Sequence, residues 1–156
     1  MIPSDAASPP KPQGCTNLKL RQLMRRVAQH YDDEVGKTGL KGTQYSLLSA
    51  VVKLGPIRAV DLADTLKLST STLSRNLQPM VTAGWLVVSP GVDARSKLIS
   101  VTPAGQIKRV EAQQHWRVAQ ERLNARLGAD KVMALHAMLD DVMTGLSSDA
   151  TEPSQP

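Results

Sequence analysis

The 156-residue chain contains no phenylalanine, and aromatic residues make up only 3% of it. Sheet-rich proteins draw heavily on aromatic and β-branched side chains, so this scarcity disfavours a β-sandwich. The hydrophobic fraction is nonetheless 41%, and six methionines are available to fill irregular gaps. We therefore expect one mainly helical domain with an aliphatic core.

Cysteine and long apolar runs are also scarce. The single cysteine, Cys15, excludes an intramolecular disulfide framework. No apolar run approaches the roughly 18 residues of a membrane span. The first residues, MIPSDAASPPKPQG, lack the apolar centre of a signal peptide. These absences predict a cytoplasmic protein without a membrane partner.

Acidic residues are outnumbered, with 14 Asp and Glu against 19 Lys and Arg, which gives a net charge of +5. A basic balance is typical of nucleic-acid-binding proteins, although many basic proteins bind no nucleic acid. The histidines His30, His115 and His136 lack the spacing of a metal site. We expect neither a metal nor another cofactor.

The two ends differ in composition from the rest of the chain. Residues 1–14 and 147–156 are rich in Pro, Ser and Ala, which predicts disordered tails around a domain at 15–146. Apolar residues recur at helical spacing in 17–35 and again in 103–146. We expect a first helix in the former segment and two long helices in the latter, beginning near Pro103 and Asp130.

The central segment, about 43–101, combines short helices with a hairpin. Thr43 is placed to cap one helix, and a short helix follows Ile57. Ser69 is placed to cap another helix, which Gly84 ends. The segments WLVVS and KLISV then read as two strands around a long turn. A short helix, a tight turn, a second helix and a hairpin predict a mainly α winged helix-turn-helix fold.

The second helix of this unit opens with STSTLSRN, a sequence of low helix propensity. Small hydroxyl side chains at a helix N-terminus suit close approach to DNA, and an arginine one turn later can reach a base edge or a phosphate. The alternative is a capping serine followed by a solvated first turn. The candidate DNA-binding residues of this helix are Ser69, Thr70, Ser71, Thr72, Ser74, Arg75 and Asn76.

The hairpin tip supplies the remaining candidate DNA contacts, Asp93, Arg95 and Lys97. An arginine at such a tip is favoured by the negative potential of a narrow minor groove. We expect Asp93 to pair with Arg95 and to hold its side chain in a pointing geometry. The alternative is an ordinary surface ion pair of little energetic value.

Three successive segments resemble the MarR family of bacterial transcriptional regulators. They are LKGTQYSLLSAV, AVDLADTLKLSTSTLSRNLQPMVTAGWL and DARSKLISVTPAG, in the order and spacing of that family. The resemblance covers about 15–146. It implies a homodimer bound to a palindromic DNA operator, with Ser69 to Arg75 as recognition contacts and Asp93 and Arg95 in the wing. It further implies release from DNA by a ligand or an oxidant.

The residues themselves also indicate a dimer. The last two helices carry more apolar side chains than one small winged core can cover, and the first helix adds Leu20, Leu23 and Val27. A second copy is the natural cover for such a surface. The predicted dimerisation region comprises 17–35 and 103–146.

The sequence leaves two ways open in which the protein could sense a signal, an oxidant at Cys15 or a small molecule in a pocket. Cys15 lies near the predicted start of the first helix with Lys19 and Arg21 nearby, a setting that lowers the pKa of a thiol, although an inert cysteine is the competing interpretation. The second route is a small-molecule pocket between the dimerisation region and the DNA-binding part. Its candidate residues are His30, Tyr31, Tyr45, His115 and Trp116.

Two other classes of protein remain as alternatives to a regulator. A thiol enzyme would use Cys15 as nucleophile, but the sequence offers neither a Gly-rich loop nor an oriented base beside it. We therefore expect no catalytic residue. A winged-helix module that binds proteins instead of DNA is the other alternative, and the salt dependence of binding to duplex DNA distinguishes the two.

Overall fold

The computed structural model describes residues 11–93 and 95–148. Of the predicted tails, 1–14 and 147–156, residues 1–10 and 149–156 lie outside the described residues. The elements, in chain order, are α1 (Thr16–Val35), the 3-10 helix η1 (Gly36–Thr38), α2 (Gly42–Leu54), β1 (Ile57–Arg58), α3 (Ala59–Thr65), α4 (Thr70–Thr82), β2 (Leu86–Pro90), β3 (Lys97–Val101), α5 (Pro103–Leu127) and α6 (Ala129–Ser148).

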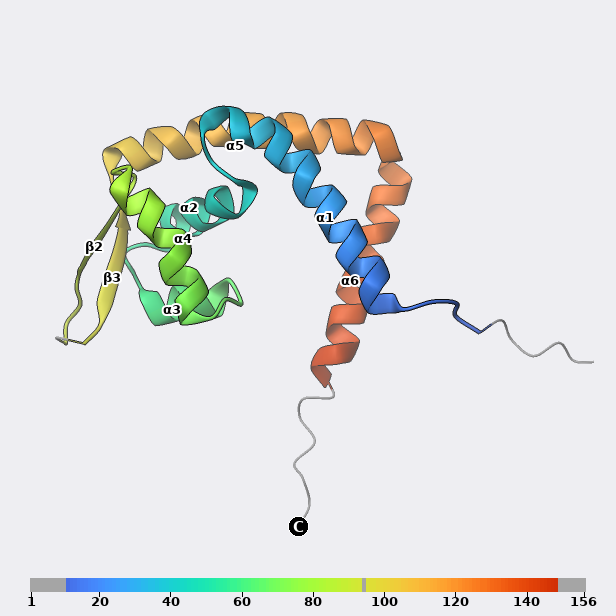
Figure 1. Ribbon diagram of the computed structural model, residues 1–156, viewed down its shortest axis with the longest axis horizontal. Coiled ribbons are helices and arrows are strands. Elements are labelled where there is room, and N and C mark those ends of the chain that lie inside the picture. The colour runs from blue at the N-terminus through green and yellow to red at the C-terminus, as the bar shows by residue number, and fades with distance from the viewer. Residues whose placement is uncertain (1–10, 94, 149–156) are drawn as a thin grey trace, which may run out of the picture.

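The long helix α5 joins two parts of the molecule (Figure 1). Below its N-terminal end lies a lobe formed by α2, α3, α4 and the β2–β3 hairpin. At its other end α6 turns away, and α1 crosses toward the same side (Figure 1). Helix α1 packs on α5 and α2, whereas α6 packs on α5. The helix-turn-helix lobe is thus separated from the free ends of α1 and α6.

The small sheet has the order β1-β3-β2 and is antiparallel throughout. Its central strand carries Ile99, which pairs with Ile57 on one side and with Val88 on the other. Alternate side chains of a strand point to opposite faces, and Ile99 and Leu86 are buried in the core while Val101 packs partly against it. The winged helix-turn-helix prediction is confirmed.

Aliphatic residues and one methionine fill the core of the lobe. Helix α4 contributes Leu73, Leu77 and Met80, whose 4- and 3-residue spacing places them on one buried stripe. They form one cluster with buried residues of α2, α3 and the sheet. Burying each such side chain stabilises the fold by about 1.5–3 kcal/mol. This burial fixes which face of α4 remains exposed.

Local signals at the start of α5 are realised in the structure. The backbone N–H of Gly105 donates to the Thr102 hydroxyl at 3.0 Å, and that hydroxyl donates to the Gly84 carbonyl at 2.6 Å. Pro103 occupies the first turn, where its missing N–H has no cost. Thr102 therefore caps α5 and also ties it to the loop between α4 and the hairpin.

Two predicted boundaries are wrong. Helix α2 begins at Gly42 and not after a Thr43 cap, since the Gln44 side chain accepts from the Lys41 N–H at 2.9 Å. Helix α6 continues to Ser148, so residues 147–148 are helical and not part of a tail. The Ser147 hydroxyl donates to the Met143 carbonyl at 2.8 Å within that last turn. In the part of the chain that the structure describes, no helix combines the length and apolar character needed to cross a bilayer.

Gly105 generates a stability prediction, because a Cβ added there would lie 2.0 Å from the Trp85 carbonyl oxygen and 2.8 Å from Val101 Cγ2. Gly105→Ala must push α5 away from the hairpin, and we expect it to lower the free energy of unfolding by about 1–3 kcal/mol. The control is Gly145→Ala in α6, where a Cβ meets nothing within 4 Å. Chemical denaturation should show Gly145→Ala as neutral or stabilising. Equal effects would contradict the proposed clash.

Candidate nucleic-acid interface

The N-terminus of α4 presents its hydroxyl groups to solvent. Ser69 caps the helix by accepting from the Thr72 N–H at 3.2 Å, which confirms the predicted cap. Its hydroxyl also lies 2.8 Å from the Thr72 hydroxyl and 3.1 Å from that of Ser71. Thr70, Ser71 and Ser74 are exposed. Free backbone N–H groups at this end favour anions such as phosphate.

Arg75 is exposed on the same face of α4, one turn beyond these hydroxyls, and Asn76 is half-buried beside it. No described side chain forms an ion pair with Arg75. Its guanidinium therefore keeps its donors for an external acceptor, for which a guanine edge and a phosphate are both suitable.

The tip of the wing is ordered by Asp93. Its carboxylate accepts from the backbone N–H groups of Arg95 at 3.1 Å and Ser96 at 2.8 Å. These hydrogen bonds lower the pKa of Asp93, because they stabilise its charged form. The expected side-chain pair of Asp93 with Arg95 is not among the described ion pairs. Asp93 instead caps the turn, since backbone donors two and three residues ahead are nearer than a flexible guanidinium.

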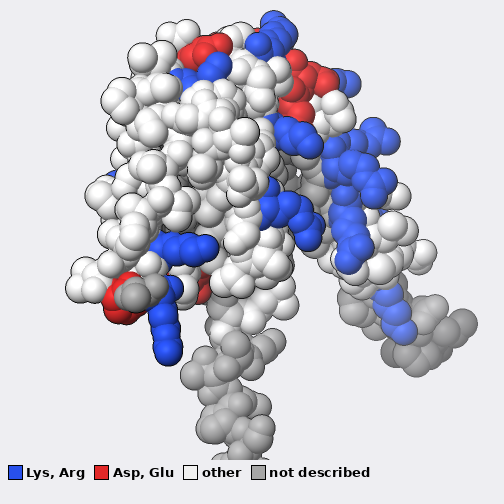
Figure 2. Space-filling view, turned by 60° about the vertical axis from the view of Figure 1, so that its left-hand side comes forward, with Lys and Arg blue, Asp and Glu red and all other residues white. Residues whose placement is uncertain are grey.

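Arg95 and Lys97 are both exposed beside this turn. Figure 2 shows blue and red side chains close together where the wing ends, at the lower left of that view. Between α4 and the hairpin lies a groove of about 280 Å³. Its rim carries Thr70, Ser74 and Lys97, so three of the candidate residues share one surface.

Sequence reasoning missed Arg58, which lies in β1 directly before α3. Its Nε donates to Asp61 Oδ2 at 2.7 Å and its Nη2 to Asp61 Oδ1 at 3.0 Å, a bidentate pair. Asp61 raises the pKa of Arg58, and the nearby charge of Asp93 adds to that effect. The signal was present in the sequence, because an arginine followed three residues later by an aspartate at a helix start is a recognisable local pairing.

The five predicted effector residues do not share one cavity. Trp116 stacks on Tyr31 and Tyr45, at 5.9 and 6.2 Å between ring centroids. Tyr31 and Trp116 line a cavity of about 270 Å³ between α1, α2 and α5. Burial raises the pKa of Tyr31, whose hydroxyl donates to Gln120 at 2.5 Å. Tyr45 belongs to α2 and is buried.

The two histidines lie apart from that cavity. His30 contacts the Ala119 carbonyl through Nε2 at 2.8 Å and lines a separate hollow beside Glu34. His115 contacts the Glu34 carboxylate at 3.0 Å. Both imidazoles therefore serve the packing of α1 on α5.

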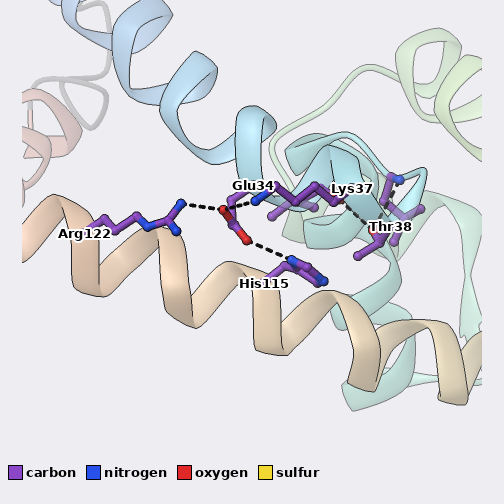
Figure 3. A network of polar contacts seen from close by, with 7 residues as sticks. Glu34, Lys37, Thr38, His115 and Arg122 are labelled. Carbon is purple, nitrogen blue, oxygen red and sulfur yellow. Dashed lines mark hydrogen bonds and ion pairs between the residues drawn. The ribbon is translucent and has the colours of Figure 1, made fainter.

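A buried carboxylate at this helix contact was also missed. Glu34 is 6% exposed, and its oxygens lie 2.8 Å from Lys37 Nζ, 3.0 Å from His115 Nδ1 and 2.6 Å from Arg122 Nη1 (Figure 3). Hydrogen bonds from Lys37 and His115, with the charge of Arg122, lower the pKa of Glu34 to about 2. Its partners on α5 are 81 and 88 residues away in sequence, so no local pattern marks the pair.

Cys15 is exposed and occupies the cap position before α1. Tyr31 follows it by 16 residues along the chain, a rise of roughly 24 Å if helical throughout. Tyr31 therefore lies far from the Cys15 thiol.

These elements define a winged helix-turn-helix protein. Comparisons with known proteins show which regulators of this class it is similar to. The MarR family profile matches residues 38–96. The HTH-type transcriptional regulator YwoH of Bacillus subtilis is 24% identical over 90 residues, which cover 58% of this chain and 66% of that protein, just under two thirds of its length. Two solved structures share the fold of this chain.

The transcriptional regulator MosR of M. tuberculosis, solved in complex with DNA, matches with a TM-score of 0.76 and 27% identity. The match covers 90% of this chain and 100% of that one. A mutant of MarR from E. coli, complexed with operator DNA, gives a TM-score of 0.74 and 21% identity over 81% of this chain and 91% of that one. This second likeness shows the fold alone.

The Glu34 cluster generates a pH prediction. A carboxyl whose pKa is near 4.5 when unfolded and about 2 when folded stabilises the fold above pH 4.5. That contribution is lost as the pH falls from 4.5 toward 2. We expect Glu34→Gln to lower Tm at pH 7, with the difference from the parent shrinking steadily below pH 4.5. Thermal melts across this range measure it.

The control for this measurement is Glu121→Gln, an exposed position on α5, the helix that carries His115 and Arg122. Its Tm should follow the parent curve from pH 7 to pH 2. A Tm difference for Glu34→Gln that stays constant with pH would show that the cluster does not depend on the charge of Glu34.

Proposed function

We propose that the chain is a homodimeric DNA-binding repressor that occupies a palindromic operator and is released by a small-molecule ligand. One observation carries the proposal: the hydroxyl-rich start of α4 and Arg75 are exposed, while the apolar residues of the same helix are buried. In a helix-turn-helix protein this helix enters the major groove and its N-terminal side chains contact base edges. MosR and MarR, which share the fold, were solved with DNA.

The dimer is supported by the apolar surface of α1, α5 and α6. Helix α6 has only Val132 buried, whereas Met138 is 62%, Val142 45% and Met143 57% exposed. A row of large apolar side chains in water is unfavourable in a monomer. A twofold-related copy covers such a row with the same row of its partner. The further exposed apolar residues of this surface are Leu18, Leu20, Leu23, Met24, Ile107, Val110, Met133, Leu139 and Leu146.

The cavity beside Tyr31 and Trp116 supports the ligand part of the proposal. It is lined by residues of α1 and α5, which also contribute to the exposed apolar surface, and of α2, which belongs to the helix-turn-helix lobe. An aromatic wall with Asp32, Thr43 and Ser46 around it suits a small ring-bearing molecule with a polar group. A molecule bound in this cavity changes the angle between the helix-turn-helix lobe and the helices of the apolar surface. It thereby changes the distance between the two α4 helices of the dimer.

The experiment that tests the function is selection of bound duplexes from a random pool. We expect two inverted half-sites whose centres lie about 10–10.5 base pairs apart, or a multiple of that distance. Affinity for the selected duplex should fall steeply between about 50 and 200 mM salt. The absence of duplex binding even at low salt would refute the regulator and favour a protein-interaction module.

Arg75→Ala tests the recognition helix. Loss of a bidentate base contact removes discrimination, so we expect affinity for the selected operator to fall by about 10-fold or more and affinity for unrelated duplexes to fall less. Fluorescence anisotropy on both duplexes measures the two losses. Equal losses would identify Arg75 as a phosphate contact and leave base readout to other residues.

Val142→Asp tests the dimer, because it places a charge in the exposed apolar row of α6. We expect the dimerisation constant to weaken by at least about 30-fold, as for truncation of an interface hot spot. Sedimentation velocity measures the mass, and circular dichroism checks that helix content is kept. The control is Ser147→Asp near the end of the same helix. Dimers of parental stability in Val142→Asp would place the interface elsewhere.

A further inference from the structure

Arg58 is held in one place by backbone pairing and in one orientation by a carboxylate. Strand β1 pairs Arg58 with Leu98 of the hairpin, which anchors its backbone to the base of the wing. The two hydrogen bonds to Asp61, at 2.7 and 3.0 Å, use Nε and Nη2. A guanidinium has five N–H donors in a rigid plane, so three donors remain for another acceptor.

The ion pair between Arg58 and Asp61 contributes little to the stability of the fold. The side chains of Arg58 and Asp61 are 62% and 46% exposed, and ion pairs this exposed add little to stability. What the pair does provide is orientation, because a two-pronged contact fixes the plane of an otherwise flexible side chain. The negative charge of Asp61 also lies directly beside the guanidinium and offsets its field.

The fixed orientation of the Arg58 side chain matters because of where Arg58 lies in the fold. The first helix of a helix-turn-helix unit crosses the DNA backbone while the second enters the groove. Arg58 immediately precedes that first helix, α3, which lies at the lower edge of the lobe with the wing tip beside it (Figure 1). The strand partner of Arg58, Leu98, follows Lys97 directly, so Arg58 lies beside the start of β3 in the wing. A phosphate along the path from α3 to the wing meets Arg58.

We propose that Arg58 contacts a phosphate of bound duplex DNA and that Asp61 competes with that phosphate for the guanidinium. This inference rests on the proposed DNA-binding function. In the free protein Asp61 occupies the bidentate edge. On binding, a phosphate oxygen takes over donors of the same edge or the three free ones, and Asp61 is left facing a negative charge. Asp61 thus weakens binding to every duplex and restrains attachment to unrelated DNA.

Four variants test the competition, with salt-dependent anisotropy on the selected operator and on an unrelated duplex. Arg58→Ala should weaken both complexes by about 10-fold and reduce the slope of log affinity against log salt by about 1. Asp61→Asn should tighten both complexes by several-fold. In the double variant Arg58→Ala/Asp61→Asn, the gain from Asp61→Asn should shrink, because its benefit acts through Arg58. Arg58→Lys should restore the slope, since the charge returns.

The control is Arg117→Ala, the same change at an exposed position in the second half of α5. It should bind both duplexes as the parent does, and Arg58→Ala should melt within about 3 °C of the parent. If the parent binds DNA and Arg58→Ala behaves like Arg117→Ala, the phosphate contact is refuted while the regulator stands. If Asp61→Asn gains equally with and without Arg58, Asp61 acts as a general repulsive charge and the competition is refuted. A parent without salt-dependent binding would instead refute the proposed function itself.

Discussion

The burial of Leu73, Leu77 and Met80 is the constraint on which the rest of this molecule depends. These three side chains seat α4 on the core, and the helix cannot rotate without exposing them. Everything on the opposite side of α4 is therefore held toward solvent, including hydroxyl groups that a helix built only for stability would not use. The low propensity of STSTLSRN is tolerated because tertiary packing, and not local preference, holds the helix together.

A second set of contacts joins the helix-turn-helix lobe to the long helices α1 and α5. Lys108 of α5 donates to the Thr38 carbonyl at 3.0 Å, and its ammonium lies 5.4 Å from the centre of the Trp85 ring at the base of the wing. Glu34 joins the end of α1 to the middle of α5 through His115 and Arg122. Both contacts converge on α5, so this one helix is tied to α1, to η1 and to the base of the wing.

The sequence predicted the elements whose signals are local. Thr102 and Pro103 mark the start of α5, and the observed helix begins at Pro103 as predicted. The hairpin strand KLISV was predicted for the same reason, since alternation and flanking turn residues lie within a few positions of each other. The Arg58–Asp61 pair was equally local and could have been found. The Glu34 cluster could not, because its helix contact depends on how α1 and α5 pack.

The candidate nucleic-acid interface likewise combines features that the sequence predicts with features that depend on the folded structure. Once the buried stripe is known, the helical period predicts that Thr70, Ser74 and Arg75 are exposed. The sequence alone therefore assigns these residues correctly to the solvent-facing side of α4. The use of Asp93 does not follow, because the choice between a backbone donor and a side-chain donor depends on turn geometry. Asp93 is engaged by the backbone and no described ion pair involves Arg95, whereas Arg58 is paired with Asp61. The two arginines flank one edge of the lobe and differ in how freely each can meet a phosphate.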